Sequence, residues 1–222
     1  MNKKLGIISG AGAFSGLFLY EKILKSISAL GIERDKDFPQ IILHNYPFES
    51  MNETGIENIE LAHLELTCAL KPLKECEKII IACNTLHLIH EEERLISLPE
   101  LILKELSLIN EKALILCSQS SKQYKLFGED YFYLDNLLLD FSNKIILDKL
   151  KGISTNEQQY INSVINQAQQ LGVNTIVVGC TELSMIDWKF YLYPNFKFID
   201  GVELATKQVL DWHLTGEKNE SL

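Results

Sequence analysis

Two stretches decide the fold of this chain, Lys78-Ile79-Ile80-Ile81-Ala82-Cys83-Asn84-Thr85 and Thr175-Ile176-Val177-Val178-Gly179-Cys180-Thr181-Glu182. Each is a β-branched apolar run followed by a small residue, a cysteine and side chains that can cap a helix. We expect each stretch to be a buried strand that delivers a thiol to the N-terminus of a helix. Two such units in one chain of domain size suggest a pair of thiols facing one ligand.

Composition indicates an ordinary globular protein. The chain has 222 residues, of which 46% are hydrophobic and 23% charged, so a sizeable core is available. The net charge of −9 and the absence of a dense basic patch argue against a nucleic-acid partner. The N-terminal apolar run is short and is broken by Gly10 and Gly12, so we interpret it as a first strand and not as a signal peptide. No apolar run approaches a membrane span, and we expect no membrane partner.

Cysteine usage predicts a reducing compartment, and hence a cytoplasmic protein. An odd, widely spaced set argues against a disulfide scaffold: Cys68, Cys76, Cys83, Cys117 and Cys180. No CxxC pair exists, so a structural zinc site is not expected.

Apolar β-type runs alternate with segments of helical period, which is typical of an α/β fold with parallel sheets. The pattern predicts strands over 5–8, 41–44, 78–82, 114–117, 131–133, 175–178 and 196–199. It predicts helices over 14–30, 53–70, 85–96, from about 119, and over 137–150, 156–171 and 201–212. The order strand, helix, strand, helix, strand-Cys occurs in each half. We therefore expect two pseudo-symmetric Rossmann-like lobes, 1–97 with the C-terminal helix 201–214 packing back, and 98–200, followed by a frayed tail at 215–222. Ligands of parallel sheets bind beyond the carboxyl ends of the strands, so the active site should lie in the cleft between the lobes.

The two cysteines carry the expected chemistry. A helix N-terminus lowers a thiol pKa and offers backbone N–H groups to a carboxylate. For either cysteine alone a buried, inert thiol is the better interpretation, but the duplicated context reverses that preference. One thiolate can remove a proton from one face of a carbon while the opposing thiol returns a proton to the other face. This chemistry needs no metal, flavin or pyridoxal group, and no Walker loop, EF-hand or HExxH motif occurs. We therefore expect neither a cofactor nor a metal.

The glycine segment Ser9-Gly10-Ala11-Gly12 does not satisfy GxGxxG, because position 15 is serine. Dinucleotide binding is therefore disfavoured. We expect a turn at Gly10 whose backbone N–H groups face a small anion.

The chain resembles the aspartate/glutamate racemase superfamily, and most closely its aspartate-racemase branch. Ala82-Cys83-Asn84-Thr85-Leu86-His87 is similar to the family's first catalytic block, ACNTxH, and Gly179-Cys180-Thr181-Glu182-Leu183 to its second, GCTEL. Weaker similarity lies at 6–12, 116–121 and 198–201. The resemblance implies cofactor-independent racemisation by Cys83 and Cys180 and a homodimer. It implies that the substrate is held by Asn84, Thr85, Thr181, Ser118 and Ser121.

Departures from the family concern the substrate's side chain. Many aspartate racemases carry an arginine in the loop after the second strand, whereas residues 45–51 contain none. A lysine used by some members would fall near Leu150, which Lys149 and Lys151 flank. Ala11 and Ala13 replace the usual Met and Pro of the glycine turn. Phe48 and Met51 would favour a different or less polar group.

Several residues keep two interpretations. His87 either tunes the thiol or is a packed helix residue. For Glu182 and Asp200 we expect helix capping, with a role at the site as the alternative. Cys68 and Cys76 are expected to be structural, and Cys117 to pack near the cleft. Trp188, Tyr191 and Tyr193 would cover the site or a dimer surface.

Three functions remain open. The first is an amino-acid racemase that uses two cysteines. The second is a racemase or cis-trans isomerase of another small carboxylate, such as a hydantoin or maleate. The third is a small-anion-binding protein on a retired racemase scaffold.

Overall fold

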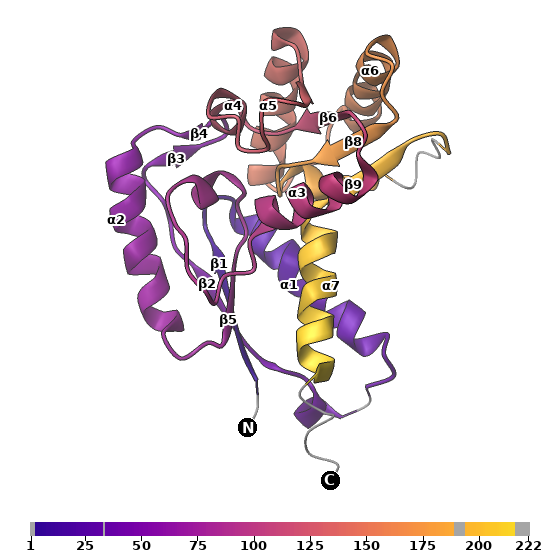
Figure 1. The fold of residues 1–222 in the computed structure, drawn as a ribbon. Coiled ribbons are helices and arrows are strands. Elements are labelled where there is room, and N and C mark those ends of the chain that lie inside the picture. The colour runs from indigo at the N-terminus through magenta and orange to yellow at the C-terminus, as the bar shows by residue number, and fades with distance from the viewer. Residues whose placement is uncertain (1–2, 33, 189–193, 216–222) are drawn as a thin grey trace.

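The computed structural model describes residues 3–32, 34–188 and 194–215, and their longer strands form two parallel sheets (Figure 1). The first sheet has the order β2-β1-β5 and consists of β1 (Lys4–Ser9), β2 (Gln40–Asn45) and β5 (Lys78–Ile81). The second has the order β7-β6-β8-β9 and consists of β6 (Ala113–Leu116), β7 (Phe132–Tyr133), β8 (Thr175–Val178) and β9 (Lys197–Asp200). The predicted two-lobed α/β class with parallel sheets is confirmed.

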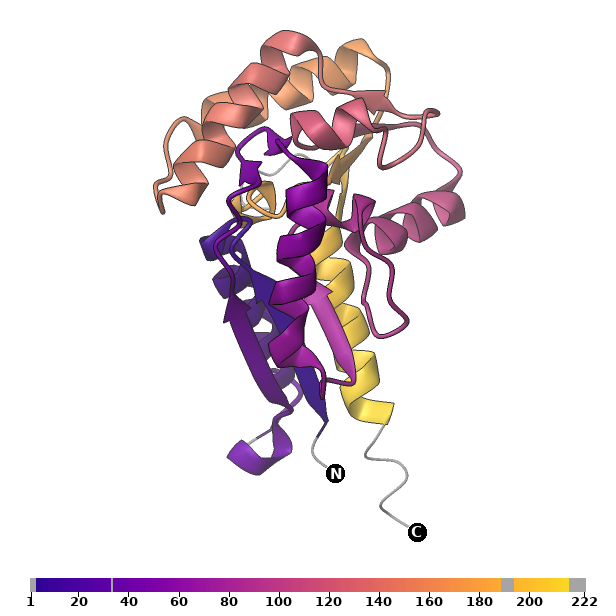
Figure 2. The same ribbon diagram turned by 90° about the vertical axis from the view of Figure 1, so that its left-hand side faces the viewer.

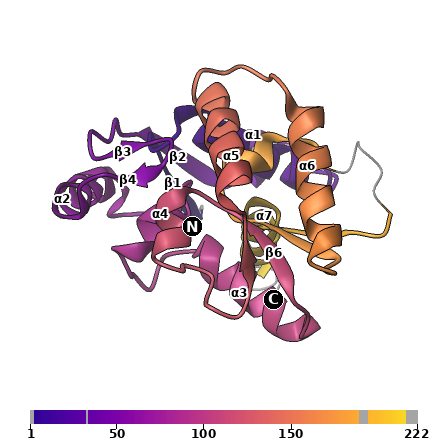
Figure 3. The ribbon, with the colours of Figure 1, turned by 90° about the horizontal axis from the view of Figure 1, so that it is seen from above.

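Helices cover both faces of each sheet: α1 (Ala13–Ser28), α2 (Ile59–Leu70), α3 (Leu98–Ile109), α4 (Gln119–Gln123), α5 (Asn136–Leu150), α6 (Glu157–Gln170) and α7 (Gly201–Thr215). On the first sheet α2 lies on one face and α1 with α7 on the other. On the second sheet α5 and α6 lie on one face and α3 on the other. Figures 2 and 3 show α5 and α6 side by side at the end of the molecule that carries the second sheet.

The two strands that precede the cysteine turns, β5 and β8, are buried on both faces. Ile80 packs toward α1 and α7, while Ile79 and Ile81 pack toward α2. In β8, Ile176 faces α5 and α6 whereas Val177 faces α3. This explains why both stretches are continuous apolar runs without polar alternation.

The last helix ties the two sheets together. It begins directly after β9 of the second sheet and packs against α1 and α3 (Figure 1). Val202, Ala205 and Val209 join the core of the first sheet with Leu5 and Ile7. As expected, Asp200 caps α7, because its Oδ1 accepts a hydrogen bond from the Val202 N–H at 2.8 Å.

The predicted helix over 85–96 is wrong. Only a 3-10 turn, Thr85–Leu88, follows the first cysteine, and the chain then returns beside β5. The Ile79 N–H donates to the Arg94 carbonyl at 2.9 Å, and the Ile96 N–H donates to the Ile79 carbonyl at 2.8 Å.

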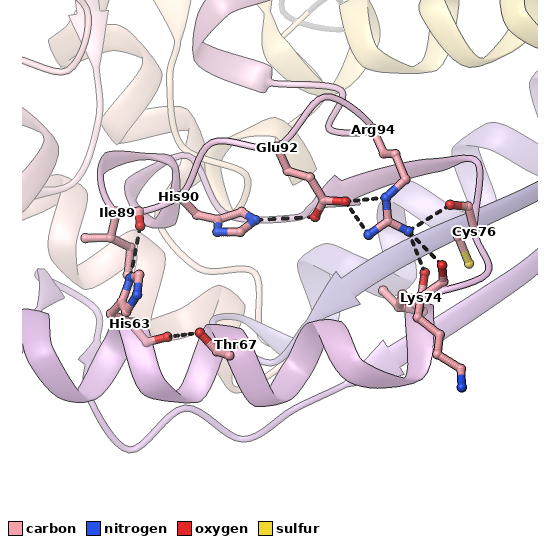
Figure 4. Close-up of polar contacts among 9 residues, drawn as sticks. His63, Thr67, Lys74, Cys76, Ile89, His90, Glu92 and Arg94 are labelled. Atoms are coloured by element: carbon pink, nitrogen blue, oxygen red, sulfur yellow. Dashed lines mark hydrogen bonds and ion pairs between the residues drawn. The ribbon is translucent and has the colours of Figure 1, made fainter.

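Arg94 fixes this return (Figure 4). Its Nη1 donates to the carbonyls of Leu73, Lys74 and Cys76 at 3.0–3.1 Å, and its guanidinium pairs with Glu92. These carbonyls belong to the segment between α2 and β5, so Arg94 ties residues 89–96 to it. A tertiary arrangement therefore overrides the helical pattern of the segment.

Two further boundaries differ from the prediction. The predicted helix over 53–70 begins only at Ile59, because Met51–Ile56 forms an antiparallel hairpin of β3 (Met51–Asn52) and β4 (Gly55–Ile56). The pattern does not predict α3. Proline is tolerated in the first turn of a helix, and Pro99 lies there in α3, after the N-cap Ser97.

Within the described residues, no helix is long and apolar enough to cross a membrane. The same part of the chain contains no group of three or more His, Cys, Asp or Glu side chains placed to hold a metal ion.

Candidate active site

Both cysteines line one cavity at the carboxyl ends of β5 and β8. The cavity has a volume of about 110 Å³ and takes its walls from both sheets. Its lining comprises the glycine turn, the β3–β4 hairpin, the two cysteine turns, Ser118 and α5: Gly10, Ala11, Gly12, Met51, Asn52, Glu53, Gly55, Cys83, Asn84, Thr85, Ser118, Ile146, Leu150, Cys180, Thr181 and Glu182. The cavity therefore brings together most residues that the sequence placed at the site.

Cys83 is a neutral thiol at neutral pH in this structure. Burial raises the pKa of the Cys83 thiol to about 12, and the nearby Glu182 carboxylate adds to the increase. The N–H groups of Leu86 and Thr85 and the Thr85 hydroxyl act in the opposite direction but do not prevail. The expected lowering of the pKa by a helix is therefore wrong, because a short 3-10 turn replaces the helix and the thiol is desolvated.

Cys180 donates its thiol proton toward Glu182. The distance from Sγ to Oε2 is 3.0 Å, and Glu182 also accepts hydrogen bonds from Thr181 Oγ1 at 3.2 Å and Ser15 Oγ at 2.8 Å. Burial is the main reason that the pKa of Cys180 is well above its usual value, and the Glu182 charge is the next. An electrostatic interaction with Cys83 is a further, smaller cause, so ionisation of one thiol influences the other.

Glu182 does not cap a helix, which corrects the expectation from sequence. It occupies the N-cap position of the 3-10 turn Leu183–Met185, but its side chain makes no capping hydrogen bond. Only 6% exposed, the side chain instead lies against the glycine turn. A Cβ atom on Gly12, which has φ +102°, would lie 2.0 Å from Glu182 Oε1. Gly12 is thus required to admit the carboxylate.

Hydroxyl groups form a buried network beside Cys83. Thr85 Oγ1 lies 3.0 Å from both Ser118 Oγ and Ser121 Oγ, and the two serines lie 3.2 Å apart. Ser118 lines the cavity, whereas Ser121 is fully buried behind it. Ser121 therefore orients its neighbours and does not contact the cavity.

Two residues of the cysteine turns contribute further polar atoms. Thr181 Oγ1 donates to the Ala82 carbonyl at 3.1 Å, which links the second turn to the first. Asn84 is 3% exposed and lines the cavity, and its side-chain oxygen is buried without a hydrogen-bond partner among the described residues. An unpaired buried acceptor is costly, and a donor on a bound ligand would satisfy it.

The glycine turn depends on Gly10, as the sequence suggested. With φ +112°, a Cβ on this residue would lie 1.7 Å from the Tyr46 carbonyl. Only glycine allows the loop after β2 to approach this closely.

His87 lies outside this cavity. It borders a different hollow, together with His90, Glu91, Glu92 and Glu93. Burial lowers the pKa of His87 to about 4, so it is neutral at physiological pH. These observations favour a packing role over tuning of the thiol.

Sequence reasoning missed part of the cavity wall. Asn52, Glu53 and Gly55 come from the unpredicted hairpin, and Ile146 from α5. Leu150 lines the cavity, while the neighbouring Lys149 pairs with Glu157 and donates to Ser154 Oγ at 2.8 Å. Among the described residues, no Lys, Arg or His lines the cavity.

Other named residues lie away from the cavity. Phe48 is buried in the core under α2, and Trp188 in the core under α5 and α6. Tyr191, Tyr193 and most of the predicted tail lie outside the described residues. All five cysteines are free, and Cys68 is exposed.

Comparison with known proteins identifies the family. The model of the Asp/Glu/hydantoin racemase family matches residues 6–209. A search of the curated proteins found no match.

Solved structures share the fold. An aspartate racemase homologue from Pyrococcus horikoshii OT3 is 22% identical, with a TM-score of 0.71, over 95% of this chain and 99% of that one. The aspartate racemase of Picrophilus torridus is 20% identical, with a TM-score of 0.72, over 96% and 94%. The glutamate racemase of Francisella tularensis, solved with D-glutamate, is 17% identical, with a TM-score of 0.65, over 97% and 82%. Because the family model matches nearly the whole chain and the fold agrees with it, the protein belongs to the Asp/Glu/hydantoin racemase family of isomerases.

Proposed function

We propose that this protein is a cofactor-independent amino-acid racemase in which Cys83 and Cys180 act as opposing acid and base at the substrate Cα. One observation carries the proposal. Two thiols, each placed by the end of a buried parallel strand, line the same small cavity. Because the strands belong to different sheets, we expect the thiols to approach a bound ligand from different sides. This is the arrangement that inversion at a carbon requires.

Glu182 supplies the route by which Cys180 loses its proton. Its carboxylate already accepts a hydrogen bond from Cys180 Sγ. The α-ammonium group of a bound amino acid would bring a positive charge into the cavity, and a nearby positive charge favours the thiolate. The thiolate then removes the Cα proton, and the Cys83 thiol, kept protonated by its raised pKa, donates a proton on the opposite face. The roles reverse for the other enantiomer.

The negative charge that develops on the substrate needs hydrogen-bond donors. The backbone N–H groups of the two cysteine turns and the hydroxyls of Thr85, Ser118 and Thr181 are the candidates for holding the α-carboxylate. Such donors stabilise the carbanionic intermediate most when they are fixed before reaction, and the Thr85–Ser118–Ser121 network fixes them.

An amino acid fits the polar groups better than maleate. The unpaired Asn84 oxygen calls for a donor, and the negative charge of Glu182 favours a cation nearby; an α-ammonium group supplies both. Maleate has no such group and would add two negative charges. A retired binding protein would have no need for both thiols.

Hydrogen exchange at Cα tests the proposal. Both enantiomers of each proteinogenic amino acid, and separately hydantoins and maleate, are incubated in D₂O and followed by NMR and chiral chromatography. We expect deuterium incorporation with loss of optical purity for at least one amino acid. Racemisation should fall to background in Cys83→Ala and in Cys180→Ala, whereas Cys68→Ala, at an exposed cysteine, should match the wild type. Turnover of only hydantoins or maleate would support the second candidate, and no turnover at all would refute both.

The proposal includes a cytoplasmic homodimer, as the family resemblance implies. The free cysteines suit a reducing compartment. Light scattering after size-exclusion chromatography measures the mass, and a monomer that is fully active would contradict the dimer.

A further inference from the structure

The β3–β4 hairpin places an unpaired carboxylate at the wall of the proposed active site. Glu53 lies at the turn of this hairpin, is half-buried and lines the cavity. Its carboxylate makes no hydrogen bond or ion pair with any described residue. Glu182, the other acidic residue of the wall, is already engaged by Cys180, Thr181 and Ser15.

The hairpin is held in place from several sides, so the position of Glu53 is set in advance. Asn52 Oδ1 accepts hydrogen bonds from the N–H and the hydroxyl of Thr54 at 2.8 and 2.7 Å. On the side of α4, the Ser120 N–H donates to the Thr54 carbonyl at 2.9 Å, and Ser120 Oγ accepts from the Ile56 N–H at 3.0 Å. Bonds within the turn and two hydrogen bonds to Ser120 therefore fix the turn that carries Glu53.

The loop before the hairpin is anchored to α2. Glu65 accepts hydrogen bonds from the N–H groups of Glu49 and Ser50 at 2.8 and 3.2 Å. Gly55, with φ +119°, allows Ser120 to approach, because a Cβ there would lie 2.4 Å from Ser120 Oγ. The hairpin is thus packed between the two lobes and is not a free loop.

Another part of the wall is apolar. Ile146 and Leu150 of α5 line the cavity, and Met51 adds a third apolar side chain. No cationic side chain of the described chain lines the cavity, and Lys149 is held by Glu157. A substrate with a second carboxylate would therefore meet like charge without a counterion, whereas an N–H donor would pair with Glu53.

We infer that Glu53 determines substrate specificity, and that the enzyme takes amino acids whose side chain ends in an N–H donor, an amide or an ammonium group, in preference to dicarboxylates. The inference rests on the proposed racemase function and adds the class of side chain to it. The α-carboxylate is held at the cysteine turns, and the side chain extends between Glu53 and the apolar surface of Ile146 and Leu150.

Isosteric substrate pairs provide the test. Cα–H exchange is measured for aspartate against asparagine, for glutamate against glutamine, and for 2,4-diaminobutyrate. Each acid and amide have nearly the same size, so their ratio reports charge and hydrogen bonding alone. We expect kcat/KM for the better amide to exceed that of its acid by about tenfold or more, the value of one charge-assisted hydrogen bond.

The Glu53→Gln variant should reduce this ratio to within about threefold, with most of the change in KM for the donor-bearing substrate. Glu49→Gln, an exposed residue of the neighbouring loop that is not part of the wall, makes the same charge change and should keep the wild-type ratio. A wild-type enzyme that prefers aspartate or glutamate would overturn the inference while leaving the racemase proposal intact. A Glu53→Gln variant that weakens all substrates equally would assign Glu53 to the common α-ammonium group and would also overturn it. No exchange with any amino acid would refute the proposed function itself.

Discussion

Replacing Glu182 by glutamine separates two effects of this carboxylate. The negative charge raises the pKa of both Cys83 and Cys180, which alone would slow a thiolate enzyme. The same carboxylate accepts a hydrogen bond from Cys180 Sγ at 3.0 Å and can receive its proton. Glutamine has nearly the same shape and can still accept from Ser15, so we expect Glu182→Gln to fold.

The structure indicates the size of the loss. A hydrogen bond to a charged group contributes about 1.5–3 kcal/mol, and losing one that acts in the proton transfer lowers the rate about 10- to 100-fold. If Glu182 relays the proton, kcat in Glu182→Gln should fall by this factor. Thiol ionisation should become easier at the same time, because the charge that opposes it is gone.

Two measurements on the same variant therefore give opposite changes. Steady-state Cα–H exchange should slow, while the pH titration of thiolate ultraviolet absorbance should move its midpoint to lower pH. Glu182→Gln in a Cys180→Ala background isolates the contribution of Cys83, and Glu49→Gln controls for a change of surface charge. A Glu182→Gln variant that is faster than the wild type at neutral pH would refute the relay. It would show that the carboxylate affects the rate only by raising the pKa of the thiols.

Two stability predictions follow from buried titrating groups. Burial raises the pKa of Asp200 from 3.8 to about 6, so the folded state binds this proton more tightly than the unfolded state. Proton binding at Asp200 therefore adds to the free energy of unfolding below pH 3.8, and this contribution is lost as pH rises through 6. Asp200→Asn keeps an acceptor for the Val202 N–H and should raise the free energy of unfolding by up to about 3 kcal/mol near neutral pH, with little gain in acid. Urea unfolding at several pH values measures this gain. An equal gain at every pH would be inconsistent with titration of Asp200. Burial lowers the pKa of His87 from 6.5 to about 4, so the folded state binds this proton less tightly than the unfolded state. The neutral His87 therefore contributes fully to the free energy of unfolding above pH 6.5, and up to about 3 kcal/mol is lost as pH falls through 4. His87→Leu should flatten the acid limb of the stability profile without abolishing Cα–H exchange, and loss of exchange with normal stability would instead place His87 in the reaction.

The strands and their cysteines could be predicted because their signal is local. A continuous run such as Ile79-Ile80-Ile81 is explained by burial on both faces, and the residue after the run is then at the carboxyl end of the sheet. The family blocks around Cys83 and Cys180 added their expected roles. The family and the α/β architecture followed from these short stretches and were confirmed.

The segments that were predicted wrongly are those that tertiary contacts decide. Residues 85–96 have helical spacing, but Arg94 bonds carbonyls near position 75 and draws the chain back beside β5. The β3–β4 hairpin depends on Ser120, which lies far along the chain. Neither partner can be found by reading the segment itself, and for this reason Asn52 and Glu53 were missed as parts of the wall.

The ionisation of the thiols also depends on contacts that the two blocks do not share. The residue two places after each cysteine is Thr85 in the first block and Glu182 in the second. The Thr85 hydroxyl lowers the pKa of Cys83, whereas the Glu182 carboxylate raises that of Cys180. The duplicated stretches therefore build one strand-end geometry twice but two different proton environments. If Glu182 relays the proton from Cys180, the Glu182→Gln variant should slow the enantiomer whose Cα–H faces Cys180 more than the other. Equal slowing of both enantiomers would contradict a relay specific to Cys180 and would place the carboxylate on a part of the substrate common to both, since loss of its charge alone should ease ionisation of the thiols.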